Sequence, residues 1–301
     1  MSRTPKYKLA MIIKIIKWTG IFLLSAVVLV AAGFGFVSVN MKNRSEKKYR
    51  FQTENLAIKS DSLTLARGKH LVAIKGCQDC HGKNLEGKIM INDNAVGRLA
   101  ASNLTKGSGG LPADYDTEDW ITALRHGIDK TGRPLIFMPS HETTLLSEED
   151  MAAVIAYCQN VPSVDNTLPA IKLGPVALVM GYFDKMPLLS VEKINHTKPM
   201  IARADSTEGV AQGEYLAISC SGCHRMDFKG GDAVAPGLPP VPDITATGNP
   251  GKWTQQQFVR ALRTGKTPSG HQMKNDEMPW QMTAQYEDKE LASLYQFLKT
   301  R

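Results

Sequence analysis

One long apolar run dominates the N-terminal part of the chain. Between Trp18 and Met41 lie 24 consecutive residues without a charged side chain. At about 1.5 Å per residue, a helix of this length reaches roughly 36 Å, enough to cross the hydrocarbon core of a bilayer. Lysine and arginine flank the run on both sides in similar numbers, so charge does not orient the helix. The pattern predicts one transmembrane helix.

A cleaved export signal is the alternative interpretation of this segment. Val30-Ala31-Ala32 would serve as a small-residue cleavage site. The run exceeds the usual apolar core of a signal peptide, however, and Trp18 at its edge suits an interfacial position. We therefore favour an uncleaved anchor in an exported protein, with residues 1–50 forming a basic N-terminus and this anchor.

After residue 50 the pattern changes to short helical segments separated by loops rich in Gly, Pro and Asn. Ser147, followed three residues later by Asp150, matches a helix N-terminus. Alternating apolar strands are missing from both halves, so we predict an all-α fold. The expected helices cover residues 63–75, 116–127 and 147–160 in the first half, and 208–219, 254–264 and 287–299 in the second.

Net charge excludes one class of partner. The formal charge of +7 arises in the first 50 residues, which hold 10 basic side chains and only one acidic side chain, Glu46. The other 251 residues hold 26 basic and 28 acidic side chains, so nothing there indicates a nucleic-acid interface. A single long apolar run also excludes a multipass membrane protein. The length of 301 residues predicts about two domains of typical size.

Two identical cysteine motifs carry the candidate chemistry. They are Cys77-Gln-Asp-Cys80-His81 and Cys220-Ser-Gly-Cys223-His224. C-x-x-C-H is the signature of c-type haem attachment: the two thiols form thioethers with the haem vinyl groups, and the histidine ligates the iron. With this composition, the expected number of chance copies of the motif is about 0.002. Two chance copies are negligible.

Three other interpretations of these cysteines are weaker. A four-cysteine zinc site does not require a histidine after each pair, and its halves are usually closer than 143 residues. A thioredoxin-like motif needs a βαβ context, which the pattern lacks. Simple disulfides suit an exported chain but leave both histidines unexplained. We therefore predict two covalently bound haems c.

The two motifs belong to an internal repeat. Met138-Pro139 begins 57 residues after His81, and Met278-Pro279 begins 54 residues after His224. An acidic helix start and an aromatic residue, Tyr157 or Phe297, follow each Met-Pro pair at matched spacing. One tetrapeptide of each half matches the other, Leu124-Arg125-His126-Gly127 with Leu262-Arg263-Thr264-Gly265. One tripeptide of each half matches as well, Asn103-Leu104-Thr105 with Asp243-Ile244-Thr245.

Both halves resemble class I cytochrome c domains, which have a helix before C-x-x-C-H, a Met-Pro loop and a terminal helix. The segment from Gly132 to Pro139, followed by Leu146-Ser147-Glu148-Glu149-Asp150, is similar to the cytochrome subunits of membrane-bound dehydrogenases. The resemblance covers about residues 60–160 and 206–301. We expect tandem cytochrome domains at 51–160 and 206–301, joined by a connector at 161–205.

The resemblance implies the iron ligands. His81 and His224 are the expected proximal ligands, and Met138 and Met278 the favoured distal ligands. The rival ligands near Met138 are His126 and His141. Those near Met278 are Met273, Met282 and His271.

In this family a proline after the motif often offers its carbonyl to the proximal histidine. Pro236 would do so in the second half, whereas residues 82–111 contain no proline. The orientation of His81 therefore stays open at this point.

Other residues have ordinary roles in this interpretation. Cys158 is expected to be an inert core residue, and His70 and His196 to be surface or structural residues. The apolar stretch 176–183 of the connector is too short to span a bilayer. We expect it to pack against one half or between the two, and contact with a membrane surface is the less favoured alternative.

An iron held by His and Met has no open position, and this ligand pair suits electron transfer. We therefore expect an electron-transfer protein rather than an enzyme: a dihaem cytochrome c anchored in the cytoplasmic membrane, with its haem domains on the periplasmic side. It would relay single electrons from a dehydrogenase or quinol-oxidising complex to an oxidase or carrier. The alternatives are a dihaem peroxidase or a haem ligand sensor with one open iron; the duplicated Met-Pro loop argues against the peroxidase.

Overall fold

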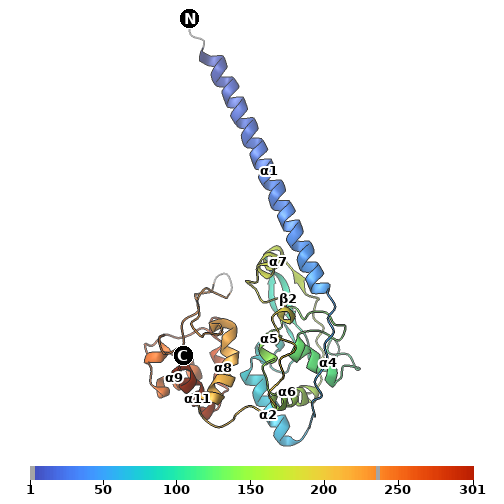
Figure 1. Cartoon of the computed structure of the whole chain (residues 1–301), viewed down its shortest axis with the longest axis vertical. Helices are drawn as coiled ribbons and strands as arrows, with labels where there is room; N and C mark the ends of the chain where they lie inside the picture. The colour runs from blue at the N-terminus through green and yellow to red at the C-terminus, as the bar shows by residue number, and fades with distance from the viewer. Residues whose placement is uncertain (1–3, 235–237) are drawn as a thin grey trace.

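The computed structural model describes residues 4–234 and 238–301. Its first element is a single helix, α1 (Thr4–Glu46), which projects from the body of the molecule (Figure 1). From Leu9 to Glu46 this helix has the length and apolar composition to cross a membrane. Most side chains from Leu9 onward are exposed, and burial against the body begins at Val37 and Met41.

The first module runs from α2 to α6. Its helices α2 and α6 cross at Gly68, where a Cβ atom would lie 2.0 Å from the carbonyl oxygen of Ala153. The glycine therefore lets the two backbones touch. The Ser147 side chain accepts a hydrogen bond from the Asp150 amide and caps α6, as predicted. The elements are α2 (Ser62–Ile74), α3 (Cys77–His81), α4 (Thr117–Ile121), the π-helical turn η1 (Thr122–His126), α5 (Ser140–Thr143) and α6 (Glu148–Gln159).

The second module runs from α8 to α11 and repeats this plan. Gly213 lies where α8 crosses α11, and a Cβ atom there would lie 2.0 Å from the carbonyl oxygen of Ser293. One difference is that α8 continues through the second motif, whereas Lys75 and Gly76 separate α2 from α3. The elements are α8 (Val210–His224), η3 (Pro250–Lys252), α9 (Gln255–Thr264), α10 (Trp280–Thr283) and α11 (Asp288–Leu298).

The expectation of an all-α fold is wrong for the loop after the first motif. Strands β1 (Lys88–Asp93), β2 (Gly97–Ala101) and β3 (Lys172–Leu173) form a small antiparallel sheet in the order β1-β2-β3. In the turn, the Asp93 carboxylate accepts hydrogen bonds from the amides of Ala95 and Val96 at 2.7 and 2.8 Å. Gly97 takes a φ of +98°. In this hairpin only Leu99 is fully buried, so burial imposes little alternation on the sequence.

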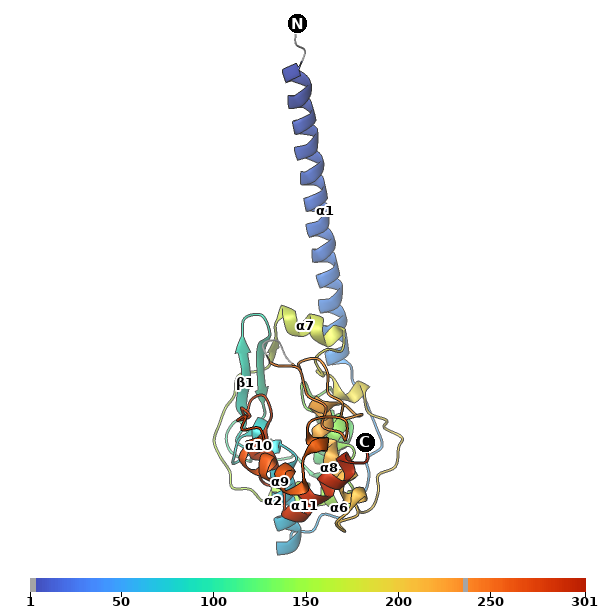
Figure 2. The ribbon, with the colours of Figure 1, turned by 90° about the vertical axis from the view of Figure 1, so that its left-hand side faces the viewer.

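The apolar stretch of the connector packs against the first module and the anchor helix rather than between the modules. Helix α7 (Pro175–Tyr182) lies across the end of α1 nearest the body (Figures 1 and 2). Ala177 of α7 shares a buried cluster with Leu99 of β2 and with two residues of α1, Val37 and Met41. The 3-10 turn η2 (Ser190–Glu192) follows, and its Glu192 forms a salt bridge with Arg44 of α1.

The two modules share one hydrophobic core. Leu71 and Ile155 of the first module belong to the same buried cluster as Leu216 and Leu291 of the second. Figure 1 shows the α8–α11 pair beside the α2–α6 pair. The short helix after each Met-Pro loop contacts the first helix of the other module. Helix α5 lies near α8, and α10 lies near α2. The modules therefore form one body around this contact.

Candidate haem-binding sites

The first motif is presented by a tight helical turn. Gly76, with a φ of +72°, ends the α2 segment and lets α3 begin at Cys77. His81 is buried, and its Nδ1 lies 2.7 Å from the carbonyl oxygen of Ser102. A carbonyl only accepts, so Nδ1 carries the proton and Nε2 keeps the lone pair that an iron needs. Burial lowers the pKa of His81, which keeps the ring neutral.

The second motif forms the last turns of α8. His224 is buried, burial lowers its pKa, and its Nδ1 lies 2.8 Å from the carbonyl oxygen of Pro242. Pro236, named from the sequence for this role, lies outside the described residues. Ser102 and Pro242 each precede one of the two matched tripeptides. The repeat alignment was thus the signal that could have found both carbonyls, and Ser102 fills the position without a proline ring because the acceptor is backbone.

The Met-Pro loops are held in the same way in both modules. Five residues after Met138, the Thr143 hydroxyl donates to the Leu124 carbonyl at 2.6 Å. Five residues after Met278, the Thr283 hydroxyl donates to the Leu262 carbonyl at 2.9 Å. Both methionines are half-buried and pack against the shared core, as do the first cysteines of the two motifs, Cys77 and Cys220. The two loops are therefore braced at equivalent places, and in each module the methionine and the first cysteine of the motif border the same core.

The rival ligands near Met138 have other partners. His126 is buried, with Nδ1 3.0 Å from Nδ1 of His196 and Nε2 3.5 Å from a carboxylate oxygen of Glu54. Its ring also lies 4.8 Å from the ring of Phe51, and burial lowers its pKa to about 4. His141 has Nδ1 3.0 Å from the Ser190 hydroxyl. Both histidines therefore take part in local contacts of the first module.

The rivals near Met278 are also placed elsewhere or left exposed. The sulfur of Met282 would lie 3.2 Å from a Cβ atom at Gly76, so it packs against the turn that introduces the first motif. His271 is exposed, and Met273 is half-buried in the preceding loop.

Two charged side chains beside the motifs were not found from the sequence. Lys75 lies between α2 and α3 with its ammonium 5.1 Å from the centre of the Tyr215 ring, and that ammonium has no hydrogen-bond partner among the described residues. Glu142 of α5 lies against the second motif, because a Cβ atom at Gly222 would be 2.4 Å from its carboxylate oxygen. Burial raises the pKa of Glu142 to about 7, against the opposing effect of Lys75. No spacing rule marks either residue.

An ionic and hydrogen-bonded network joins the modules with approximate two-fold symmetry. His70 and Tyr215 each follow a crossing glycine by two residues. His70 Nε2 lies 2.8 Å from the Glu290 carboxylate of the second module, and the Tyr215 hydroxyl donates to the Asp150 carboxylate of the first at 2.8 Å. Arg67 adds two bonds to Asp150, at 2.9 and 3.0 Å. His70 is thus structural, as expected.

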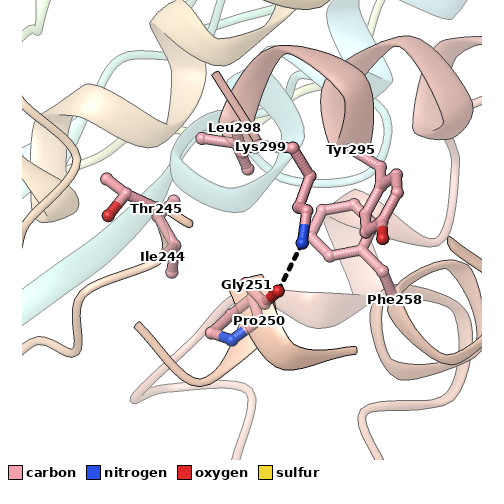
Figure 3. Close-up of a pocket in the computed structure, with 8 residues that line it drawn as sticks. All are labelled: Ile244, Thr245, Pro250, Gly251, Phe258, Tyr295, Leu298 and Lys299. Atoms are coloured by element: carbon pink, nitrogen blue, oxygen red, sulfur yellow. Dashed lines mark hydrogen bonds between the residues drawn. The ribbon is translucent and has the colours of Figure 1, made fainter. Parts of the chain in front are cut away.

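A shallow pocket of the second module contains none of these ligands (Figure 3). It lies beside α9 and α11, and the Lys299 ammonium donates to the Gly251 carbonyl across it. The equivalent hollow of the first module has a volume of about 250 Å³ and is lined in part by Leu104, Trp120 and Cys158. Cys158 is buried, and burial raises the pKa of its thiol, which keeps it inert as expected.

The donor set fits covalent haem. Each module offers two thiols one helical turn apart, a neutral imidazole fixed by a carbonyl, and a thioether on a braced loop. These are the groups that c-type attachment and His/Met ligation require. The geometry and the duplication together define a class of haem-binding electron-transfer domain.

Comparison with known proteins agrees with this class. The sequence model of the cytochrome c family matches residues 65–162 and 210–301. The chain therefore belongs to the cytochrome c family, whose members carry covalently bound haem c and transfer electrons.

Curated relatives are cytochrome subunits of dehydrogenases. The chain is 26% identical over 237 residues to the cytochrome c subunit of a quinone alcohol dehydrogenase from Gluconobacter oxydans, covering 69% of this chain and 48% of that protein. It is 26% identical over 227 residues to a fructose dehydrogenase cytochrome subunit from Gluconobacter japonicus, covering 68% and 45%. It is 26% identical over 174 residues to a gluconate 2-dehydrogenase cytochrome c subunit from Pantoea cypripedii, covering 52% and 37%. The chain thus spans less than half the length of these relatives.

Proposed function

We propose that this chain is a dihaem cytochrome c that relays single electrons between redox proteins on the outer side of the cytoplasmic membrane. One observation carries the proposal: both attachment motifs lie at the contact between the modules. Met282 packs against Gly76 before the first motif, and Glu142 packs against Gly222 within the second. Two redox centres attached there would be neighbours.

Each module assigns the same roles to its residues. Cys77 and Cys80 would attach the first haem, with His81 and Met138 holding its iron. When bound, a haem with these ligands supplies a one-electron couple at a raised potential. The Ser102 carbonyl fixes the His81 ring and makes Nε2 a better donor.

The second module supplies the same set. Cys220 and Cys223 would attach the second haem, and His224 and Met278 would hold its iron. The Pro242 carbonyl orients His224 as Ser102 orients His81. With both irons saturated, neither module offers an open position to a substrate, which favours a relay over a peroxidase or a ligand sensor.

The relatives support a partner class. Because three of them are cytochrome subunits of dehydrogenases, we infer that a dehydrogenase donates electrons to this chain. A quinol-oxidising complex is the alternative donor, and a terminal oxidase or soluble carrier is the acceptor. Helix α1 would anchor the chain as a single membrane span, with residues 51–160 and 206–301 as periplasmic haem domains and 161–205 as the connector.

Photoreduction tests the relay. A photoexcited small-molecule donor would inject less than one electron per molecule into the detergent-solubilised holoprotein, and both haem absorbances would be followed in time. We expect an initial bimolecular phase and then a redistribution between the haems whose rate does not depend on protein concentration. Phases that all scale with protein concentration would contradict an internal relay.

A further inference from the structure

We propose that helix α7, with Phe183 at its end, rests in the headgroup layer of the membrane and fixes the first module against the lipid surface. The inference rests on the proposed role of α1 as an anchor and adds a second membrane contact. It also gives the connector a task that the sequence left open.

The depth of α7 follows from the part of α1 that it touches. The ring of Tyr182 meets the ring of Phe36 edge-on at 6.1 Å, and Ala177 packs with Val37 and Met41. All three α1 residues lie in the last two turns of the uncharged run, which ends before Lys42. The run reaches roughly 36 Å, whereas the hydrocarbon core is about 30 Å thick. Its last turns, and α7 with them, therefore lie at the membrane boundary.

The outer face of α7 suits this layer. Leu173 to Phe183 contains no charged residue, yet Phe183 is 63% exposed and Val179 is 36% exposed. Aromatic side chains favour the membrane interface. A stretch of 11 residues is too short to span the hydrocarbon core of the bilayer. Lys172 precedes the stretch, and Asp184 and Lys185 follow it; because Asp184 pairs with Lys193, the exposed Lys172 and Lys185 are left to meet anionic headgroups.

Helices α7 and α1 are held as one unit. A Cβ atom at Gly181 would lie 2.5 Å from Leu188 and 3.1 Å from Met41, so the glycine allows close packing of α7. Arg44, one turn beyond Met41, pairs with Glu192 after the connector helix. A rigid junction of this kind would stop the haem modules from swinging about the anchor. The end of the body opposite α1 would then always point away from the membrane. Figures 1 and 2 show the helices of the second module and the start of α2 on that far side.

Photo-crosslinking tests the contact in the full holoprotein. Benzoylphenylalanine would replace Phe183, or Val179, in protein reconstituted into vesicles of phosphatidylethanolamine and phosphatidylglycerol, and lipid adducts would be measured by mass spectrometry. Leu24, 66% exposed in the middle of α1, is the positive control. Leu63, 82% exposed in α2, is the negative control. These side chains are exposed, and an unchanged haem spectrum would verify folding.

The outcomes separate the two proposals. We expect lipid adducts at positions 24, 179 and 183, with yields at 179 and 183 at least fivefold above that at 63. Adducts at 24 with only background yield at 179 and 183 would overturn the α7 contact and leave the anchor standing. Background yield at 24 as well would overturn the anchor and, with it, this inference.

Discussion

At the residue scale, backbone groups decide how the histidines are presented. The Ser102 and Pro242 carbonyls accept from Nδ1 of His81 and His224, and so leave the free lone pair on Nε2. The hydroxyls of Thr143 and Thr283 brace the loops of Met138 and Met278. The proposed ligands were readable from the motif and the repeat. Their supports were not, since a carbonyl acceptor leaves no mark on residue type.

Replacing Met138 by Ala should open one iron. Loss of the thioether leaves His81 as the only protein ligand, so carbon monoxide should shift the reduced spectrum of one haem, and its potential should fall. The Met282→Ala variant is the matched control, because Met282 packs against Gly76 rather than facing a ligand position in this account. An unchanged spectrum and potential in Met138→Ala would refute the ligand assignment.

His126 should make folding stability depend on pH. Its pKa is about 4 in the folded chain, because burial outweighs the attraction of Glu54, whereas an unfolded histidine titrates near 6.5. The unfolded state therefore binds the proton more readily, and stability present above pH 6.5 is lost as the pH falls towards 4. Arg125, and His196 when it is protonated, also disfavour the protonated His126 ring.

Denaturant unfolding at pH 7, 5.5 and 4.5 checks this effect. The His126→Asn variant should lose less stability over this range than the wild type, and the exposed His271→Asn variant should behave like the wild type. Equal slopes in all three proteins would contradict the assignment. The haem spectrum of His126→Asn should stay unchanged, because Met138 rather than His126 is the proposed ligand.

At the element scale, each module is built on a crossing of its first and last helices. The crossing glycines bring α2 onto α6 and α8 onto α11 at backbone contact. The six expected helices lie within about five residues of their predicted ends, because caps such as Ser147 and Thr254 and the apolar faces are local signals. The hairpin β1–β2 could not be predicted. Its main buried contact, Leu99, is with α1 and α7, which are distant in sequence.

Replacing Gly68 by Ala should destabilise the first module. The new Cβ would lie 2.0 Å from the Ala153 carbonyl oxygen and 2.7 Å from Cβ of Tyr157, so the helices must separate. Overpacking of this kind costs about 1–3 kcal/mol. Lys69→Ala, an exposed change on the same helix, should leave the free energy of unfolding nearly unchanged. Equal stabilities of the two variants would show that the crossing tolerates the methyl group.

At the scale of the whole molecule, the two modules form one body around a quasi-symmetric contact. The sequence predicted two modules and their repeat, but not how they meet. The pairs His70–Glu290 and Tyr215–Asp150 join residues at least 65 positions apart, and each partner looks like an ordinary surface residue of its own helix. Such contacts depend on the docking of finished modules, which no local pattern encodes.

The Tyr215→Phe variant should weaken this contact. It removes the hydrogen bonds of the hydroxyl with Asp150 and with the Ser147 amide, at a cost of about 1–2 kcal/mol. We expect slower electron redistribution between the haems after photoreduction, with each haem spectrum unchanged. Tyr295→Phe is the control, because its hydroxyl bonds to Trp253 within the second module. If both variants redistribute electrons at the wild-type rate, the contact does not set the haem spacing.

The central claim is that one chain carries two saturated, covalently bound haems. The most direct test is to purify the full chain in detergent after expression with a c-type haem maturation system. The intact mass would count the haems, and the reduced spectrum would be recorded with and without carbon monoxide. We predict two haems per chain and no carbon monoxide shift. A single haem, or a shift at either iron, would contradict the account.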